Sequence, residues 1–484
     1  MTEVKREREL KFEVPQDFRV PDVTNLIEHA TVEQSTITLR TTYFDTAELD
    51  LLRHAVTLRR REGDADTGWQ LKIPADEARD EIRQPLRAAK EPPARLVALL
   101  AGIVSPGTLA EVATLETERR LVRVHRDGGL VVEIADDRVV ARSGDGREDE
   151  WRELEIELGE AGDEKVLSAF AKRLKSSGAT TSAHASKLAR ALAHQPVEST
   201  SPAGQLISDY LQPQLRRLVA GDISIRRGQD DIVHKTRVGA RRIRSILRVF
   251  PEVFDADEFG ADVFGQNAAR ALDAELSWYQ DLLGEIRDRQ VQRTHFASAV
   301  DALPDELVLG PVAGRIEQTL LAEQLIAFHN VSAALATDRY RHLLDTVTAI
   351  ADGTHVAPGI RRTEVRRLAD KATHTASRRL RHAVRGADPD ELHRARKAAK
   401  RARYAAELAS HGGDKKKIKK YKEVQDVLGE HQDAVVSAEV IRRLGTRAGT
   451  VRDENGFTYG VLYQRELDAE QRLRAAAAGL RIPT

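Results

Sequence analysis

The sequence lacks cysteine altogether, so disulfide bonds and thiolate metal ligands are both excluded. Aromatic residues make up only 5% of the chain, which leaves few stacking platforms for the bases of single-stranded nucleic acid. The sequence also lacks any run of about 18 apolar residues that would span a bilayer, and its first residues are too charged for a signal peptide. We therefore expect a cytoplasmic protein without a membrane partner.

The net charge is zero, but the positively and negatively charged side chains are unevenly distributed along the chain. The 484 residues include 76 basic and 76 acidic side chains. Residues 1–195 carry 30 Lys and Arg against 36 Asp and Glu, whereas the rest of the chain carries 46 against 40. The chain is longer than one ordinary domain, and an acidic part joined to a basic part indicates two domains with different partners.

The first part of the chain alternates apolar and polar residues as strands do. The pattern predicts strands near residues 36–43, 55–61, 68–73, 129–134 and 153–158, a short helix at 94–100 and a closing helix at about 163–194. Residues 1–195 are therefore predicted to form an α+β domain with a mainly antiparallel sheet.

The second part has a different composition and contains a repeat. Residues 196–201 lie between two prolines and are small and polar, as is typical of a linker. Beyond them, long runs of Ala, Leu, Arg and Glu predict an all-α bundle over residues 202–484. Residues 280–288 (QDLLGEIRD) and 425–433 (QDVLGEHQD) agree at six of nine positions. This repeat predicts a duplication, with halves at about 202–350 and 351–484.

Charged residues at every second position mark several of the predicted strands. Glu7, Glu9 and Lys11 would point to one face of a strand, and two carboxylates on one face attract a cation such as Mg²⁺ or Mn²⁺. Arg59 and Arg61 alternate in the same way. A single charged strand face usually only meets water. Several in one sheet, if the sheet closes on itself, would surround a polar lumen with cations for phosphate and carboxylates for metal.

These segments resemble the CYTH family, the triphosphate tunnel metalloenzymes, over residues 3–195. The resemblance rests on Glu7-x-Glu9-x-Lys11, Tyr43-Phe44-Asp45-Thr46, Leu58-Arg59-Arg60-Arg61, Leu71-Lys72, Arg79-x-Glu81, Arg119, Asp136, Glu153-x-Glu155 and Ser186-Lys187. It implies a closed β-tunnel in which triphosphate is bound by Lys11, Arg59, Arg61, Lys72, Arg79, Arg119 and Lys187. It also implies that one or two divalent ions are held by Glu7, Glu9, Asp136, Glu153 and Glu155.

The implied reaction is a metal-assisted attack of water on a terminal phosphoryl group, in which positioning and electrostatics do most of the work. Glu7, Glu9 and Lys11 are the expected catalytic residues. Two positions depart from the family pattern: Thr117 stands where a lysine is common, and Arg83 where a second glutamate often follows Glu81. Both departures bear on turnover and substrate choice more than on binding.

Basic stripes mark the helical part. His234, Arg237, Arg241, Arg244 and Arg248 recur at spacings of three and four, which places them on one face of a helix. The second half repeats the pattern with His393, Arg396, Lys400 and Arg403. Like charges one turn apart repel, so such a stripe is suited to holding a polyanion. No acidic residue lies between Val233 and Phe250, which argues against an ordinary solvated face.

The stripes resemble the CHAD family of histidine-containing α-helical domains over about residues 202–480. The matching segments are His234-x2-Arg237, Arg241-Arg242-x-Arg244, Leu283-Gly284-x2-Arg287-Asp288, His393-x2-Arg396, Lys400-Arg401-x-Arg403-Tyr404 and Leu428-Gly429 to Asp433. The resemblance implies inorganic polyphosphate binding by His234, Arg237, Arg241, Arg242, Arg244, Arg248, His393, Arg396, Lys400, Arg401, Arg403 and Tyr404. In the repeated motif, the glycine is expected to allow a turn or a close helix approach, and Asp288 and Asp433 to pair with stripe arginines.

Three functions remain open at this point. The first is a triphosphatase that acts on inorganic triphosphate or a related compound, with polyphosphate bound by the helical domain. The second is a non-catalytic polyphosphate-binding or targeting protein, and the third is an adenylate cyclase, a chemistry that the tunnel fold also hosts. Nucleic acid is the less favoured partner for the stripes, and a homodimer is left open.

Overall fold

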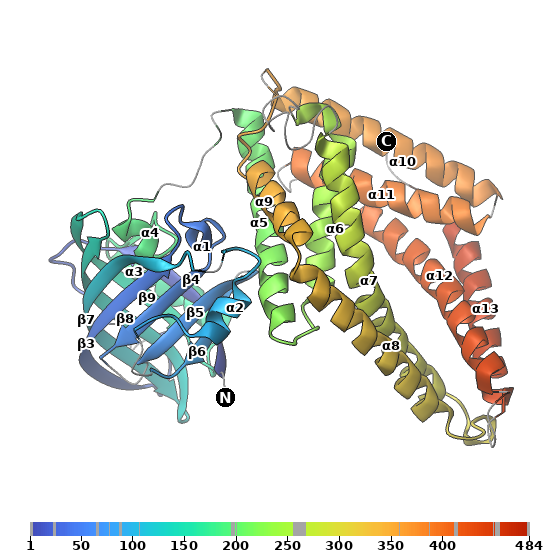
Figure 1. Ribbon diagram of the computed structural model, residues 1–484, viewed down its shortest axis with the longest axis horizontal. Helices are drawn as coiled ribbons and strands as arrows, with labels where there is room; N and C mark the ends of the chain where they lie inside the picture. Colours follow the sequence, from blue (N-terminus) through green and yellow to red (C-terminus); the bar gives the residue numbers. More distant parts are fainter. Residues whose placement is uncertain are drawn as a thin grey trace. The chain divides into compact units, whose positions relative to one another are not determined.

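The computed structural model describes residues 3–22, 26–63, 67–76, 78–86, 90–105, 107–194, 199, 201–254, 268–357, 359–386, 388–410, 415–448, 450 and 455–481. The chain divides into two compact units, Met1–Pro196 and Val197–Thr484 (Figure 1). Of the expected linker at residues 196–201, only residues 199 and 201 belong to the described part of the chain.

The first unit is built on one antiparallel sheet. Its described strands are β1 (Glu3–Glu7), β2 (Glu9–Glu13), β3 (Thr31–Asp45), β4 (Thr57–Glu62), β5 (Gly68–Ala75), β6 (Ala78–Gln84), β7 (Ala110–Arg126), β8 (Gly129–Ser143), β9 (Glu148–Leu158) and β10 (Thr180–Thr181). They pair in the order β1-β6-β5-β4-β3-β7-β8-β9-β2-β10. The five predicted strands correspond to β3, β4, β5, β8 and β9, so the α+β antiparallel prediction is confirmed.

The N-terminal segment brings the two ends of this sheet toward each other. β1 pairs with β6 at one edge, whereas β2 pairs with β9 near the other. Only Arg8 separates the two strands, and its carbonyl oxygen accepts a hydrogen bond from the amide of Leu158. The sheet therefore curls into a tunnel-like half-barrel. The expectation of one continuous strand through Glu7, Glu9 and Lys11 is wrong, because the chain changes partner strand at Arg8.

The outer face of the sheet carries one apolar core cluster, and a second one, which includes Val139 and Trp151, lies on its inner face. Leu154 and Ile156 of β9 are fully buried and pack with Phe170 of α3 (Glu164–Ser176). The remaining helices of this unit are short: α1 (Asp50–Arg53), α2 (Ala94–Leu99) and α4 (Lys187–Ala191). The single closing helix expected at 163–194 is therefore wrong. Gly178 adopts φ 102°, a left-handed conformation that ends a helix, and β10 follows it.

The second unit is helical. It contains α5 (Pro202–Arg226), α6 (Val233–Val249), α7 (Ala268–Asp301), α8 (Val312–Leu335), α9 (Asp338–Ala351), α10 (Arg362–Gly386), α11 (Pro389–Ala409), α12 (Lys415–Ala448), α13 (Phe457–Ala477) and the short 3₁₀ helices η2 (Pro251–Val253) and η3 (Asp305–Leu307). Ser201 caps α5 by accepting a hydrogen bond from the amide of Gly204, directly before Pro202. The all-α prediction for this part is confirmed.

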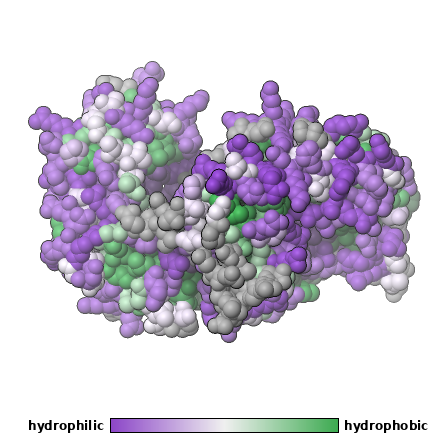
Figure 2. All heavy atoms as spheres, turned by 90° about the horizontal axis from the view of Figure 1, so that it is seen from above, coloured by the Kyte–Doolittle hydropathy of each residue, from purple (hydrophilic) through white to green (hydrophobic). Residues whose placement is uncertain are grey.

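The two copies of the repeated motif lie inside the longest helices, α7 and α12. The motif is thus not a turn, and its glycine serves a close approach between helices. Buried alanines such as Ala376, Ala395 and Ala399 let α10 and α11 pack closely. Polar residues cover most of the face shown in Figure 2. Among the described residues, no helix is long and apolar enough to cross a membrane.

Candidate functional sites: a charged tunnel and a basic helical cluster

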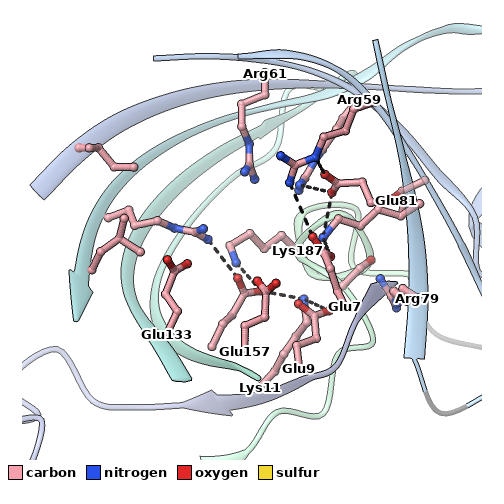
Figure 3. A pocket seen from close by; sticks show the side chains of 18 of the residues that line it. Glu7, Glu9, Lys11, Arg59, Arg61, Arg79, Glu81, Glu133, Glu157 and Lys187 are labelled. Atoms are coloured by element: carbon pink, nitrogen blue, oxygen red, sulfur yellow. Dashed lines mark hydrogen bonds and ion pairs between the residues drawn. The ribbon is translucent and has the colours of Figure 1, made fainter. Parts of the chain in front are cut away.

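A polar cavity of about 270 Å³ lies on the inner face of the curled sheet (Figure 3). Its walls carry nine basic side chains: Lys11, Arg59, Arg61, Lys72, Arg79, Arg83, Arg119, Arg123 and Lys187. They also carry six acidic ones: Glu7, Glu9, Glu81, Glu133, Glu155 and Glu157. A cavity with an excess of positive charge and few apolar walls is suited to a strongly anionic ligand.

Arg59 is held rigidly in this wall. Its guanidinium donates to the Gln70 side chain at 2.7 Å and lies 3.4 Å from a Glu81 carboxylate oxygen. Burial works against its charge, but Tyr43 and Glu81 more than compensate and raise its pKa. Glu81 is fully buried, and the cations Lys72, Arg59 and Arg83 overcome burial and hold its pKa at about 2.

Arg61 has the same orientation but no such partner. Its residue is only 6% exposed, and within the described part of the chain its guanidinium forms no ion pair and its Nε has no hydrogen-bond acceptor. Burial, Arg59 and Arg119 lower its pKa to about 10, so it still carries its charge at neutral pH. A buried guanidinium without an anion is costly, which marks this position as a place for an external anion.

Glu7, Glu9 and Lys11 all line the cavity, although they come from two strands (Figure 3). Lys72 bridges Glu7 at 2.5 Å and Glu81 at 3.3 Å. Lys11 lies 3.3 Å from Glu9 and 2.7 Å from Glu155. Burial alone would raise the pKa of Glu9, but Lys11 and Lys72 lower it to about 2.

Three carboxylates from neighbouring strands form a cluster at one side of the cavity. Oxygens of Asp137, Glu153 and Glu155 lie within 4.8 Å of one another. The Lys187 ammonium lies among them, at 3.0, 2.5 and 2.8 Å respectively. Despite burial, these three carboxylates raise the pKa of Lys187. Carboxylate oxygens in this arrangement are ligands of the kind that Mg²⁺ and Mn²⁺ prefer.

Arg119 of the neighbouring strand β7 holds two carboxylates of this cluster. It donates to both oxygens of Asp137 at 2.8 and 2.7 Å and to Glu155 at 3.0 Å. Although burial opposes its charge, Asp137 raises the pKa of Arg119 well above its ordinary value. Each of the seven residues expected to bind triphosphate thus lines the cavity.

Asp136 is the one predicted metal ligand that lies elsewhere. Its carboxylate is held by Arg152 at 2.8 Å through both oxygens. β8 pairs with β9 so that Asp137 stands opposite Glu153 and Asp136 opposite Leu154. Asp137 therefore shares the tunnel face with Glu153, and Asp136 points to the other face. Asp137 replaces Asp136 in the candidate site.

Arg123 and Glu133 are two site residues that the sequence pattern did not predict. Both line the cavity and bond to each other at 2.7 Å across β7 and β8. Arg123 lies four positions after Arg119 and Glu133 lies four positions before Asp137, so each has the same strand parity and alternation from a correctly assigned Asp137 finds both.

The helical unit brings the two basic stripes together. α6 packs against α11, and the charges of Arg237, Arg241, Arg396 and Lys400 act on one another. These four residues form what we call the central cluster. Burial, Arg396 and Arg241 lower the pKa of Lys400 to about 6, and no hydrogen bond or ion pair of its ammonium occurs among the described residues.

The repeated motif supports this cluster. A Cβ added to Gly284 would lie 3.3 Å from the Arg237 guanidinium, and one added to Gly429 would lie 3.1 Å from that of Arg396. Each glycine therefore makes room for the stripe arginine of its own half. Asp288 pairs with Arg237 at 3.0 Å, and Asp433 acts electrostatically on Arg396.

The histidines flank the cluster as neutral groups. Burial lowers the pKa of both His234 and His393, and neighbouring cations lower it further. The other predicted stripe residues are tied into pairs: Arg244 and Arg248 hold Asp273, and Arg403 holds Glu407. Arg242 lies over the ring of Tyr404, and Arg401 lines a separate pocket beside α10.

Comparison with known proteins agrees with both halves of this description. A CYTH domain model matches residues 5–192, and a CHAD domain model matches residues 209–442. An uncharacterized protein of Mycobacterium tuberculosis is 35% identical over 503 residues, which covers 97% of this chain and 94% of that protein.

Two solved structures are similar to more than half of this chain. PptA from Streptomyces chartreusis has 20% identity and a TM-score of 0.47, covering 57% of this chain and 98% of that chain. The CHAD domain of the plant Ricinus communis has 24% identity and a TM-score of 0.44, covering 59% of this chain and 95% of that one. On the domain matches and the full-length relative, this chain belongs to the family of proteins in which a CYTH domain is followed by a CHAD domain.

Proposed function

We propose that the CYTH domain binds inorganic triphosphate, or a related triphosphate, in the tunnel and hydrolyses its terminal phosphoanhydride bond with Mg²⁺ or Mn²⁺. The CHAD domain binds inorganic polyphosphate. The observation that carries the first part is Arg61, a buried guanidinium without an anionic partner in the described structure, inside a cavity lined by nine cations. A chain of phosphates supplies the missing anion.

The divalent ion fits the carboxylates of the tunnel. Asp137, Glu153 and Glu155 offer hard oxygen ligands close together, and Glu7 and Glu9 offer others on the adjoining wall. A bound Mg²⁺ or Mn²⁺ would supply charge stabilisation at the phosphoryl oxygens. Lys187 holds the three carboxylates in place, so the ion and the ammonium compete for the same oxygens.

The remaining chemistry belongs to the side chains of the tunnel. In the reaction, water oxygen bonds to the terminal phosphorus and the bond from that phosphorus to the bridging oxygen breaks, which gives orthophosphate and diphosphate. Arg59, Arg61 and Arg119 stabilise the charge on the phosphoryl oxygens. Glu9 is ionised at neutral pH but, with a pKa of about 2, is too weak a base to take a full proton, so it orients the water by accepting a hydrogen bond.

The two competing functions of the tunnel differ in measurable products. Among the described lining residues, Tyr43 is the aromatic one, so a stacking partner for a nucleobase is scarce and a cyclase is less favoured. We expect phosphate release from tripolyphosphate with Mg²⁺ or Mn²⁺, and losses of about 10- to 100-fold in Glu7→Ala and Glu9→Ala. Glu118→Ala, an exposed residue of β7, is the control. Absence of metal-dependent release from tripolyphosphate, ATP and long polyphosphate would exclude hydrolysis, and cyclic AMP from ATP would show a cyclase.

Polyphosphate binding by the CHAD domain rests on the central cluster. Arg241, Arg396 and Lys400 are partly or largely buried cations whose side chains form no hydrogen bond or ion pair in the described structure. Arg241→Gln and Lys400→Gln should each weaken polyphosphate binding, and added salt should weaken it further. Duplex DNA bound as tightly as polyphosphate would contradict the assignment.

A further inference from the structure

The two halves of the CHAD domain carry opposite charges at one pair of matched positions in α6 and α11. When His234 is aligned with His393, Arg242 of α6 corresponds to Arg401 of α11, and Arg248 of α6 corresponds to Glu407 of α11. α6 and α11 pack against each other, so each matched arginine faces the end of the other helix. The duplication therefore produces two related sites, one around Arg242 and one around Arg401, which can be compared directly.

In one of these sites the chain provides its own anion. The Glu407 carboxylate lies 3.4 Å from the Arg242 guanidinium and 2.8 Å from Arg403. The Tyr210 hydroxyl donates to Glu407 at 3.3 Å, and Arg242 lies over the rings of Tyr210 and Tyr404. Both arginines of this site lie beside the Glu407 carboxylate, so it is a structural clamp.

In the related site the carboxylate is replaced by a cation. Arg401 and Arg248 line a pocket of about 290 Å³ together with Lys371 and Arg379 of α10. Arg401, Lys371 and Arg379 form no hydrogen bond or ion pair through their side chains within the described chain, whereas Arg248 shares Asp273 with Arg244. Glu252, at the exposed rim, is the acidic residue that lines the pocket. Burial, Arg248 and Arg379 lower the pKa of Arg401, and the carboxylate of Asp273 offsets them only in part.

The pocket differs from the central cluster in position and in lining. Arg401 follows Lys400, so its side chain is turned by about 100° around α11. Val249, Leu368 and Ala372 give the pocket an apolar wall. α10 itself carries eight Lys and Arg against two acidic residues, so the approach to the pocket is strongly basic. Thr375 adds a hydroxyl to the same wall.

We propose that the pocket between α6, α10 and α11 is a second anion site, which binds a small phosphorylated organic molecule. Its phosphate supplies the negative charge that the Glu407 carboxylate supplies in the related site and lies against Arg401 and Arg379, and its uncharged part lies on Val249, Leu368 and Ala372. A pocket of this size suits a phosphate with one small apolar group rather than a larger ligand. The site is independent of both the tunnel and the central cluster.

Calorimetric titration of the full chain with phenyl phosphate tests this assignment, because the probe combines one phosphate with one apolar ring. We expect one site that binds phenyl phosphate more tightly than inorganic phosphate. Arg401→Gln and Arg379→Gln should each weaken binding about 10-fold or more, the usual effect of losing one charge-assisted hydrogen bond. Arg378→Gln is the matched control, since it removes a neighbouring exposed arginine of α10 that does not line this pocket.

A second variant keeps the test independent of folding defects. Arg248→Glu recreates the carboxylate of the related site, so it should abolish phenyl phosphate binding while the chain remains folded by circular dichroism. Arg241→Gln and Arg61→Gln should leave phenyl phosphate binding unchanged. Unaltered binding in Arg401→Gln and Arg379→Gln, equal loss in Arg241→Gln or Arg61→Gln, or no binding by the unmodified chain would each overturn the proposal.

Discussion

Some charged side chains of the tunnel have an ionic partner within the protein, whereas others have none until a ligand binds. Arg59 neutralises the buried carboxylate of Glu81, whereas Arg61 has two cations near it and no anionic partner in the described structure. In the protein without ligand, Arg59 therefore increases the stability of the fold, whereas Arg61 on the same strand face decreases it. A buried ion pair loses stability when one partner is removed, but an unpaired buried charge costs stability while it is present.

This contrast predicts opposite effects of two matched substitutions. Arg59→Gln should lower the Tm, because Glu81 loses a hydrogen-bonded cation, at a cost of about 1–3 kcal/mol. Arg61→Gln should leave the Tm unchanged or raise it, because it removes an uncompensated buried charge. Thermal unfolding without phosphate ligands measures both. A larger destabilisation by Arg61→Gln than by Arg59→Gln would show that Arg61 has a structural partner.

Lys187 leads to a prediction about the metal. Lys187→Gln removes the ammonium from among Asp137, Glu153 and Glu155, so the three carboxylates repel one another more strongly. We expect a lower Tm without metal and a larger increase in Tm on adding Mn²⁺ or Mg²⁺ than in the unmodified protein. Lys175→Gln, an exposed residue of α3, should behave like the unmodified protein. An equal increase in Tm on adding metal in both variants would show that the ion does not bind at Asp137, Glu153 and Glu155.

Asp136 and Asp137 show how far residue-level reasoning extends. Alternation identified the carboxylates of β9, but two adjacent aspartates on β8 have opposite parity, and their sequence does not say which faces the tunnel. The pairing of Asp137 with Glu153 shows that Asp137 faces the tunnel. Such pairing joins segments that are distant in the chain, so the local sequence does not reveal it.

At the scale of elements, five of the described strands and the helical character of the second unit followed from local pattern, and the partners of these elements did not. The alternation through Glu7, Glu9 and Lys11 is continuous in sequence, yet β1 and β2 lie at different ends of the sheet. The repeated motif likewise contains a glycine that also suits a turn, but it lies within α7 and α12 because Arg237 and Arg396 need the space. Both outcomes depend on segments far away in the chain.

The packing of α6 against α11 leads to a prediction about pH. Lys400 has a pKa of about 6 in the folded protein because burial and the arginines of the central cluster, Arg396, Arg241 and Arg237, outweigh Asp433. Between pH 6 and the ordinary lysine value, the unfolded chain binds this proton and the folded chain does not. The contribution of Lys400 to stability therefore increases as pH rises through this window. Bound polyphosphate reverses the shift, so binding at pH 7.5 should take up a proton.

Calorimetry in two buffers of different ionisation enthalpy measures that proton uptake. Lys400→Arg should still bind polyphosphate, with less proton uptake, because a guanidinium stays charged at this pH. Polyphosphate affinity of the unmodified protein should fall as pH rises from 6 to 9. Polyphosphate binding without proton uptake in either protein would contradict the proposal that burial and neighbouring arginines lower the pKa of Lys400.

The whole molecule joins two domains that, in the proposed function, bind phosphate chains by different means. The CYTH domain surrounds its cavity with strands that carry both signs of charge, which suits a short chain and a metal. The CHAD domain presents cations from two helices with few acidic partners, which suits a long polyanion. The order of the two domains and their fold classes followed from the sequence. The second anion pocket did not, because it appears only when α6, α10 and α11 are assembled.

The central claim is that each domain has its own site for phosphoanhydride chains. Titration of the full chain with tripolyphosphate and with long polyphosphate, for the unmodified protein, Arg61→Gln and Arg241→Gln, tests it most directly. We predict that Arg61→Gln weakens tripolyphosphate binding in the tunnel about 10- to 100-fold and leaves long polyphosphate binding intact, and that Arg241→Gln does the reverse. Loss of both ligands in one variant, or of neither in both, would contradict the account.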